Sequence, residues 1–557
     1  MRLTVCRMRR DAIRLLENSL RLASLVGVVT LLPQTMKGTD WSTLFTAQDV
    51  RDHLSTAEGR EEALNFCRRL GLSKVYLEVF RDGVQADAQT LKTSRDEFRR
   101  AGLKVSGCVT TTGLGKPSTG WRVAACYANR ANRDRLAKTF RSAAEIFDEI
   151  MIDDFFFTDC ECSECAAAKG EMSWRQYRKQ LMLEVSRDSV LGPARAVNPN
   201  VKIILKFPQW YDKFQDRGYS SREESGLYDR IWTGTELRDP SSDEWGHTQQ
   251  YRGFFLYRWL TEIAGAKNGG GWFDPYGTDP TFYLDQAYVT MLAGAPEIFL
   301  FHYGELAFKY RAQADALAAE RPKLDDLAKL VGEWRGIPAY KPPSSDPGNE
   351  AYLFDQIGML AIPLEPTSRF PQAAPAALFT VHSLEDTEFV SQLARFLTAG
   401  HTALVSEGLA HLLDGDPRLP ASDSISLAKG ELFKTAREGI GTLYVFSDTL
   451  PHLTYVDAQN RTESLTPKLR AALAALRSAV AGFEATSLDA PPRVAVFPIG
   501  GARVAVMNFT ELPVACHLAG PAAIGRKFRQ VFATSGASLA ADGITLDMPA
   551  HGLVVVQ

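Results

Sequence analysis

Short apolar runs alternate with stretches of helical periodicity through the first half of the chain. Continuous apolar runs are typical of buried parallel strands, whereas apolar residues three or four positions apart indicate helices. One helical stretch, GREEALNFCRRLG, ends at Gly71, a residue type that commonly follows a helix. The apolar runs that we interpret as strands occupy residues 41–47, 74–80, 103–112, 150–157, 201–210, 229–239, 269–277 and 297–305. Eight β/α units over about 260 residues match the size of a TIM barrel, so we predict an α/β fold that begins with a (β/α)8 barrel.

Polar residues recur at the C-terminal end of nearly every predicted strand. A doubly wound open sheet would give a similar alternation of strands and helices, but its strand ends would be spread along one edge. In a barrel the same ends converge on one site. This convergence favours the barrel and selects as candidate site residues Glu78, Asp153, Asp154, Lys206, Glu236, Asp274 and His302.

Two further segments follow the barrel. The proline-rich segment YKPPSSDPGN ends the first domain. Next come a strand, a helix that ends at Gly400 and another strand, which is the pattern of a small α/β unit. After Pro491 and Pro492, short alternating apolar runs between turns indicate an antiparallel β module. The predicted domains are a TIM barrel at 39–338, a Rossmann-like α/β domain at 345–485 and a C-terminal β-sandwich module at 490–557.

Residues 1–38 resemble an export signal. The pair Arg9-Arg10 precedes an apolar run from Leu22 to Leu32 that is too short to span a bilayer but suits a signal peptide. A twin-arginine signal of this kind predicts export to the periplasm or cell envelope. The alternative is an amphipathic N-terminal helix or a start codon assigned too early, which would make the protein cytoplasmic. The rest of the chain predicts no membrane span, and the net charge of -3 does not indicate nucleic-acid binding.

A cluster of cysteines follows the fourth predicted strand. Cys160, Cys162 and Cys165 form the pattern C-x-C-x-x-C, and Cys126 lies in the preceding βα loop. Adjacent βα loops of a barrel meet at one rim, so these four thiols can form a tetrahedral zinc site. A disulfide within C-x-C would be strained, which argues against two local bridges. We predict a structural zinc ion, with a reduced, metal-free thiol cluster as the alternative.

The cysteine pattern and the domain order resemble the family-42 β-galactosidases. Those retaining TIM-barrel enzymes have a cysteine after the third strand and C-x-C-x-x-C beyond the fourth, which together bind zinc. They continue into a Rossmann-like domain, which mediates trimers, and a C-terminal β module. The resemblance implies a carbohydrate substrate and contacts between copies through the middle domain. The family ends its fourth strand with Asn-Glu, whose Glu is the acid/base, whereas this chain reads Asp153-Asp154-Phe155, so the catalytic pair does not transfer.

Glycoside hydrolysis needs two carboxyl groups that face each other across the scissile bond. The strand-four pair, Asp153 and Asp154, and Glu236 at the end of strand six are the main candidates. They resemble the α-galactosidase and α-glucosidase type of barrel, which implies Asp154 or Asp153 as nucleophile and Glu236 as acid/base. Adjacent strand residues point to opposite faces, so only one of the two aspartates can point inward unless the strand ends between them.

Asp274, after the seventh strand, is the rival to this assignment. Family-42 enzymes carry their nucleophile at the seventh strand, so the resemblance also allows Asp154 as the acid with Asp274 as nucleophile. An Asp before Pro also commonly opens a turn. The other residues that we predict to bind substrate are polar or aromatic strand-end residues: Glu78, Lys206, Trp210, Arg238, His302 and Tyr303.

These observations predict a glycoside hydrolase, retaining by analogy of fold and exo-acting because the βα loops are short. The leading alternative is a non-catalytic carbohydrate-binding barrel, and a third is another hydrolase or lyase that uses the same rim. We find no Ser-His-Asp arrangement and no Gly-rich phosphate loop, so esterase and nucleotide-dependent chemistry are unsupported.

Overall fold

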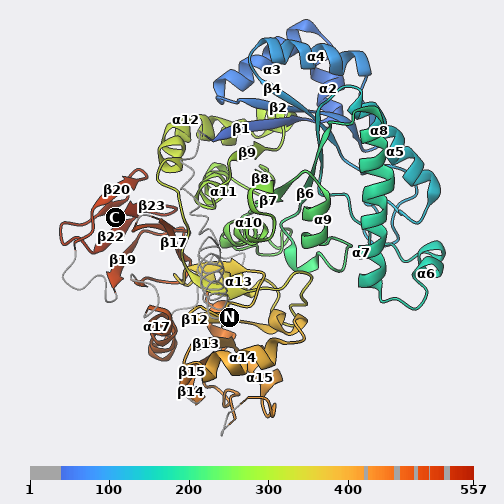
Figure 1. Cartoon of the computed structure of the whole chain (residues 1–557). Helices are drawn as coiled ribbons and strands as arrows, with labels where there is room; N and C mark the ends of the chain where they lie inside the picture. Colours follow the sequence, from blue (N-terminus) through green and yellow to red (C-terminus); the bar gives the residue numbers. More distant parts are fainter. Residues whose placement is uncertain are drawn as a thin grey trace, which may run out of the picture. The chain divides into compact units, whose positions relative to one another are not determined.

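The computed structural model describes residues 39–419, 424–438, 440–456, 465–481, 487–500, 502–519 and 527–557 (Figure 1). The predicted export signal at 1–38 lies outside these residues. Within them, no helix is long and apolar enough to cross a bilayer.

Eight parallel strands form a closed barrel. Its strands are β1 (Asp40–Phe45), β2 (Lys74–Arg81), β4 (Lys104–Val109), β5 (Glu149–Ile152), β6 (Lys202–Phe207), β7 (Arg230–Gly234), β8 (Asn268–Phe273) and β9 (Glu297–Leu300). Strands neighbour one another in chain order, and β1 pairs with both β2 and β9, which closes the ring. A short strand, β3 (Val84–Gln85), extends the end of β2 as a hairpin. The predicted TIM barrel is confirmed.

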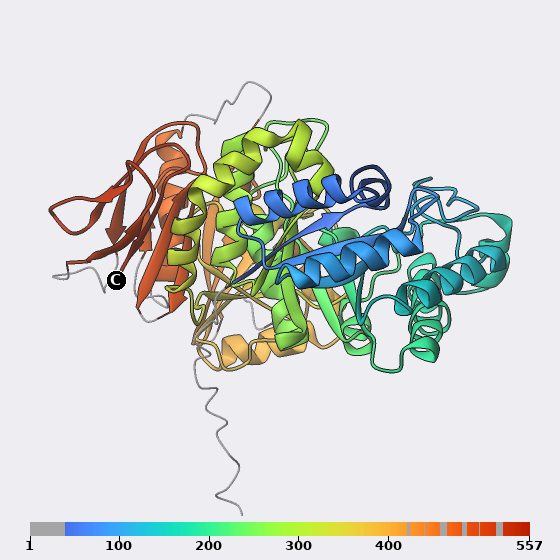
Figure 2. The ribbon, with the colours of Figure 1, turned by 90° about the horizontal axis from the view of Figure 1, so that it is seen from above.

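Helices lie on the outside of the barrel strands in both ribbon views (Figures 1 and 2). Several begin at residues whose side chains accept a backbone hydrogen bond, such as Asp87 before α4 and Asn129 before α5. Such caps typically contribute about 1 kcal/mol each. The outer helices are α2 (Ala47–His53), α3 (Ala57–Arg69), α4 (Ala88–Arg100), α5 (Arg130–Ala144), α6 (Ser163–Lys169), α7 (Trp174–Val185), α8 (Gly192–Val197), α9 (Ser221–Leu227), α10 (Tyr251–Ala264), α11 (Pro280–Leu292) and α12 (Arg311–Ala328).

The barrel interior is filled with side chains. Trp232 on β7 needs space beside β8, where Gly269 and Gly270 provide it. A Cβ atom on either glycine would lie 2.6 Å or less from the Trp232 ring, so neither position tolerates a side chain without rearrangement. The buried apolar residues of this interior cluster are Leu44, Tyr76, Cys108, Met151, Ile204, Trp232, Trp272, Phe299 and Phe301.

Strand β5 ends at Ile152, just before the two adjacent aspartates. Asp153 and Asp154 therefore follow the strand and do not alternate across it. Both can face the same end of the barrel, and both line the same cavity there. Two consecutive residues within a strand would point to opposite faces of the sheet. Asp153 and Asp154 do not, because β5 and its hydrogen bonds to the neighbouring strands end before them.

A six-stranded sheet follows the barrel, in the order β11-β10-β12-β13-β15-β14. Its pairs are parallel except for the antiparallel edge strand β14. The strands are β10 (Ile337–Tyr340), β11 (Leu364–Thr367), β12 (Ala376–Phe379), β13 (Thr402–Ser406), β14 (Phe433–Glu438) and β15 (Gly441–Phe446), with helices α13 (Leu353–Gly358), α14 (Phe389–Thr398), α15 (Glu407–Leu413), α16 (Thr449–His452) and α17 (Pro467–Ala481). Since β10 belongs to this sheet, the sheet begins before the proline-rich segment.

Two antiparallel sheets complete the described chain, as the alternating C-terminal runs predict. The first has the order β16-β19-β22-β21 and the second β17-β18-β23-β20. Their strands are β16 (Ser487–Asp489), β17 (Val494–Gly500), β18 (Arg503–Asn508), β19 (Val514–Ala519), β20 (Gln530–Ala533), β21 (Ser538–Leu539), β22 (Thr545–Met548) and β23 (Leu553–Val556).

Candidate active site

A cavity of about 410 Å³ opens at the C-terminal ends of the barrel strands. This is the face at which TIM-barrel enzymes carry their active sites. The residues that line the cavity come from seven of the eight strands or from the loops that follow them. They are Arg81, Trp121, Asp153, Asp154, Phe155, Lys206, Gln209, Trp210, Glu236, Arg238, Trp245, Trp272, Asp274, Tyr276 and Phe301.

Lys206 hydrogen-bonds two carboxyl groups in this cavity, and its Nζ lies 3.7 Å from a third, Asp153 Oδ1. Its Nζ lies 2.5 Å from Glu236 Oε1 and 2.9 Å from Asp154 Oδ2. The sum of these distances means that the two carboxyl oxygens can be no more than 5.4 Å apart. The ammonium also lies 4.1 Å from the centroid of the Trp272 ring, whose face attracts cations. Burial would lower the pKa of Lys206, but attraction to the carboxylates raises it overall, so the lysine is charged.

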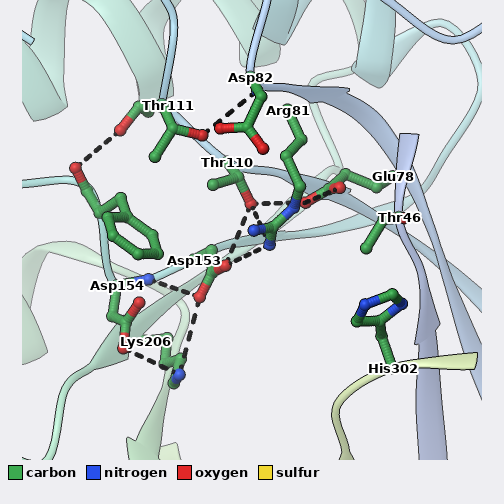
Figure 3. Close-up of polar contacts among 12 residues, drawn as sticks. Thr46, Glu78, Arg81, Asp82, Thr110, Thr111, Asp153, Asp154, Lys206 and His302 are labelled. Atoms are coloured by element: carbon green, nitrogen blue, oxygen red, sulfur yellow. Dashed lines mark hydrogen bonds and ion pairs between the residues drawn. The ribbon is translucent and has the colours of Figure 1, made fainter. Parts of the chain in front are cut away.

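Asp153 is held by a network of hydrogen bonds with Arg81, Thr110 and the backbone of Asp154 (Figure 3). Its Oδ2 accepts from Arg81 at 2.5 Å and from Thr110 at 3.1 Å, and its Oδ1 accepts from the backbone N–H of Asp154 at 2.8 Å. Burial favours the neutral acid, but Lys206 and Arg81 outweigh it and lower the pKa of Asp153. Both oxygens are therefore engaged by the protein, and Asp153 is fixed as a carboxylate.

Asp154 has the opposite electrostatic environment. Burial raises its pKa most, Lys206 opposes this effect, and the neighbouring charges of Asp153 and Glu236 add to it. The resulting pKa is about 8. Tyr219 donates to the backbone carbonyl of Asp154 at 2.7 Å and so fixes its position. Asp154 is thus protonated at neutral pH, and the ionised Asp153 beside it favours this state.

Glu236, Arg238 and Asp274 line the cavity from the loops that follow β7 and β8. Arg238 donates to Asp274 Oδ2 at 2.7 Å, and Asp274 Oδ1 accepts from the backbone N–H of Tyr276 at 3.0 Å. Burial raises the pKa of Asp274 to about 6, with Arg238 opposing and Glu236 adding to the effect. Glu236 Oε2 is buried and has no hydrogen-bond partner among the described residues.

The structure brings together all three predicted catalytic carboxylates and four of the predicted substrate-binding residues: Lys206, Trp210, Arg238 and Asp274. Glu78, His302 and Tyr303 lie outside the cavity lining. Glu78 is fully buried and accepts from Arg81 at 2.8 Å, while His302 Nδ1 lies 2.7 Å from Asp49 Oδ2. Tyr303 stacks on Phe45 in the core between strands and helices. Position at a strand end identified these residues, but it does not determine the direction of a side chain.

Several lining residues were missed by the sequence analysis. Arg81 ends β2 only three residues after Glu78, and a basic residue at a strand end was the signal that could have found it. Trp121 and Trp245 lie in loops without any periodic pattern, so the sequence carries no comparable signal for them. Phe155, Gln209, Trp272, Tyr276 and Phe301 also line the cavity and were not among the predicted site residues.

The four predicted cysteine ligands form one cluster. Their sulfur atoms all lie within 4.8 Å of one another. Cys126 Sγ is 3.7 Å from the sulfurs of both Cys162 and Cys165, which are 3.8 Å apart. A tetrahedral ion with Zn–S bonds of about 2.3 Å would space its sulfurs by about 3.8 Å. The thiols are far too distant for disulfides, and with Cys160 they could hold one metal ion.

Comparison with solved structures shows where this fold has been seen before. Gan42B, a GH42 β-galactosidase, matches 94% of this chain and 98% of its own, with a TM-score of 0.60 and 11% identity. The exo-β-1,4-mannosidase Op5Man5 from an Opitutaceae bacterium matches 74% of this chain and 92% of its own, with a TM-score of 0.47 and 12% identity. At such identity the first match shows a shared fold, and it includes the domains beyond the barrel.

Comparison of sequences gives one relative and one family. An uncharacterized protein of Saccharolobus solfataricus is 27% identical over 390 residues, which are 63% of this chain and 64% of that protein. The match thus spans less than two thirds of the relative. The family model described as "Probable glycosyl hydrolase, catalytic domain" matches residues 30–327, more than half of the chain and nearly all of the barrel. The protein therefore belongs to this family of glycosyl hydrolases.

Proposed function

We propose that the protein is a retaining glycoside hydrolase whose catalytic pair is Asp154 and Glu236. The observation that carries the proposal is the spacing of these two groups, because the two oxygens that share the Lys206 ammonium can be no more than 5.4 Å apart in one cavity. Retaining glycosidases hold their two carboxyl groups about 5 to 5.5 Å apart, whereas inverting enzymes leave room for a water molecule between them.

The protonation states favour Asp154 as the acid/base and Glu236 as the nucleophile. This division is the reverse of the one that the sequence resemblance implied. A general acid must carry a proton at working pH, and the raised pKa of Asp154 provides it. A nucleophile must face the anomeric carbon with a free oxygen, and Glu236 Oε2 has no hydrogen-bond partner among the described residues, while Oε1 lies 2.5 Å from Lys206 Nζ.

In the first step Asp154 gives its proton to the glycosidic oxygen as that bond breaks, and Glu236 forms a bond to the anomeric carbon. In the second step Asp154, now a carboxylate, takes a proton from a water molecule that attacks the same carbon and releases Glu236. Asp153 keeps a negative charge beside Asp154 throughout, because Arg81 and Thr110 hold it. That charge favours the return of the proton to Asp154.

Asp274 is the alternative nucleophile. Both of its oxygens accept hydrogen bonds, from Arg238 and from the Tyr276 backbone, whereas Glu236 Oε2 has no partner in the described chain. This difference supports Glu236 as the attacking group and Asp274 as a residue that orients Arg238 toward the substrate. The limited size of the cavity, about 410 Å³, supports exo-action, because it suits a terminal sugar better than the middle of a long chain.

A panel of aryl α- and β-glycosides tests the proposal. We expect turnover of at least one sugar, with proton NMR of the first product showing the same anomeric configuration as the substrate. A product of opposite configuration would contradict the retaining mechanism. If no glycoside is turned over but sugars bind to the cavity, the carbohydrate-binding alternative would replace the enzymatic one.

We also propose that the four cysteines hold a structural zinc ion. A closed site of four thiolates leaves no position for substrate, so the ion would supply cross-linking and no reaction chemistry. It would join the loop that contains Cys126 to the segment from Cys160 to Cys165. Lys116, whose Nζ lies 3.6 Å from Cys162 Sγ, would offset part of the negative charge of the thiolates.

Metal analysis tests this site. We expect about one zinc per chain, and we expect Cys162→Ser to lose the ion and lower the melting temperature by at least about 5 °C, because metal-binding energy contributes to folding. Cys516→Ser is the matched control, since Cys516 is a buried thiol outside the cluster and its loss should leave the zinc content unchanged. A metal-free wild type of undiminished stability would contradict the assignment.

A further inference from the structure

Aromatic side chains surround the mouth of the cavity on the side of Asp154. Trp121, in the loop after β4, is 42% exposed, and its ring centroid lies 5.6 Å from those of Phe155 and Phe157. Trp210, in the loop after β6, contacts Phe157 from the other side, with ring centroids 5.4 Å apart. Trp121, Phe155 and Trp210 all line the cavity. Exposed indole faces of this kind suit stacking against a sugar or another flat ring.

A single arginine stands among these rings. The guanidinium carbon of Arg217 lies 5.1 Å from the ring centroid of Trp121, 4.8 Å from that of Trp210 and 5.0 Å from that of Phe157. Within the described chain, the structure records no ion pair and no side-chain hydrogen bond for this group. Its neighbour Asp216 pairs with Arg175 instead. Arg217 thus carries a positive charge that aromatic rings flank and that no carboxylate of the described residues pairs with. It is not itself among the residues that line the cavity, but two of the rings it stands among, Trp121 and Trp210, are.

The position of Trp121 is fixed by the protein. Its backbone N–H donates to Asp159 Oδ2 at 2.9 Å, and Asp159 Oδ1 accepts from the Ser118 hydroxyl of the same loop. The loop is attached again at Cys126, which belongs to the cysteine cluster. The backbone that carries Trp121 is therefore held in place before any ligand arrives, which reduces the entropic cost of binding.

The side of the cavity on which these residues lie identifies what they would contact. Phe155 follows Asp154 directly, and Tyr219, which donates to the Asp154 carbonyl, packs against Trp210 with ring centroids 5.5 Å apart. Glu236, Arg238 and Asp274 line the same cavity from the loops that follow β7 and β8. Under the proposed function Asp154 protonates the leaving group, so the leaving group lies beside Asp154 and the sugar that is attacked lies beside Glu236.

We infer that Trp121, Trp210 and Arg217 form the leaving-group subsite and that it takes a ring carrying a carboxylate or another anionic group. The indoles stack on the ring, and the in-plane N–H donors of the guanidinium bind the anion, a geometry that favours paired oxygens. The assignment of this subsite to the leaving group rests on the proposed function. The binding of an anion by Arg217 does not depend on it.

Two matched substrates test the specificity. For the sugar that the wild type hydrolyses best, the 4-carboxyphenyl glycoside is compared with its neutral isostere, the 4-carbamoylphenyl glycoside. The carbamoyl phenol is the more acidic leaving group, so preference for the carboxylate cannot arise from the departing phenol. We expect kcat/KM to favour the carboxylate about tenfold, with Arg217→Gln removing this preference while retaining the hydrolysis of the neutral substrate. Arg122→Gln, which removes the same charge from an exposed position of the Trp121 loop, should keep the preference.

A binding measurement separates failure of the subsite from failure of the proposed function. The full chain is titrated with 4-hydroxybenzoate and with 4-hydroxybenzamide, and tryptophan fluorescence is followed. We expect the benzoate to bind about tenfold more tightly, through Arg217, even if the glycoside panel shows no turnover. Equal affinity for the two compounds, or a preference that survives Arg217→Gln, would overturn the inference whatever the enzyme assays show.

Discussion

Replacement of Glu236 by glutamine should lower kcat by at least about a thousandfold on every glycoside that the wild type cleaves. Glutamine has the same shape but is neutral, so it cannot form the covalent bond to the anomeric carbon. It also leaves the Lys206 ammonium without one of its buried carboxylate partners. Because the side chain remains polar and of equal size, we expect the fold and the zinc content to be unchanged. Steady-state kinetics, circular dichroism and metal analysis check these outcomes.

Chemical rescue then identifies the role of Glu236. In Glu236→Gly, azide can occupy the space of the missing carboxylate and attack the anomeric carbon directly, giving a glycosyl azide of inverted configuration. Glu244→Gln is the control, since Glu244 is an exposed carboxylate of the same loop and its substitution should leave kcat unchanged. Full activity of Glu236→Gln would refute the assignment, and an azide product of retained configuration would restore Glu236 to the acid/base role.

Activity of the wild type should fall as the pH rises through about 8. The pKa of Asp154 is raised to about 8, so the group is protonated below this pH and loses the proton above it. A general acid without its proton cannot assist departure of the leaving group, and the alkaline limb of kcat/KM therefore reports Asp154. In Asp154→Ala this limb should disappear, because the group that titrates is gone.

The Asp154→Ala substitution should lower kcat/KM by an amount that depends on the leaving group of the substrate. We expect kcat/KM of Asp154→Ala to fall by about 10² to 10⁴ for alkyl glycosides, which need protonation, and far less for 2,4-dinitrophenyl glycosides, which do not. Azide should accelerate the variant and give a glycosyl azide of retained configuration. Asp148→Ala removes an exposed carboxylate just before β5 and should change neither the pH profile nor the leaving-group dependence. Equal losses on both substrate types would show that Asp154 acts in another way.

Much of the fold follows from the sequence alone. Buried parallel strands must be apolar along their whole length, so the eight runs and the helices between them predict a barrel without any knowledge of contacts. The strand ends then converge by geometry, which is why Asp153, Asp154, Lys206 and Glu236 could be named as neighbours. The cysteine spacing likewise indicated a cluster, because Cys126 and the C-x-C-x-x-C segment lie in adjacent loops.

The tertiary structure decided which of these residues face the cavity. Glu78 is covered by Arg81, and Tyr303 turns toward the outer helices, although both lie at strand ends. Strand β5 stops before Asp153, so both aspartates reach the cavity. The end of a strand depends on where its hydrogen-bonded neighbours end, which is a property of the sheet and not of the local sequence.

The sequence by itself thus determined the class of fold, the rim at which the chemistry lies and the residue types available there. Only the tertiary structure decided the protonation of the two adjacent aspartates. Asp153 and Asp154 are the same residue type at adjacent positions. Burial favours the neutral acid at both, but Lys206 and Arg81 outweigh it and lower the pKa of Asp153, whereas burial prevails and raises the pKa of Asp154. Charge and burial act through space over a few ångströms, and the groups responsible come from strands that are far apart in the chain.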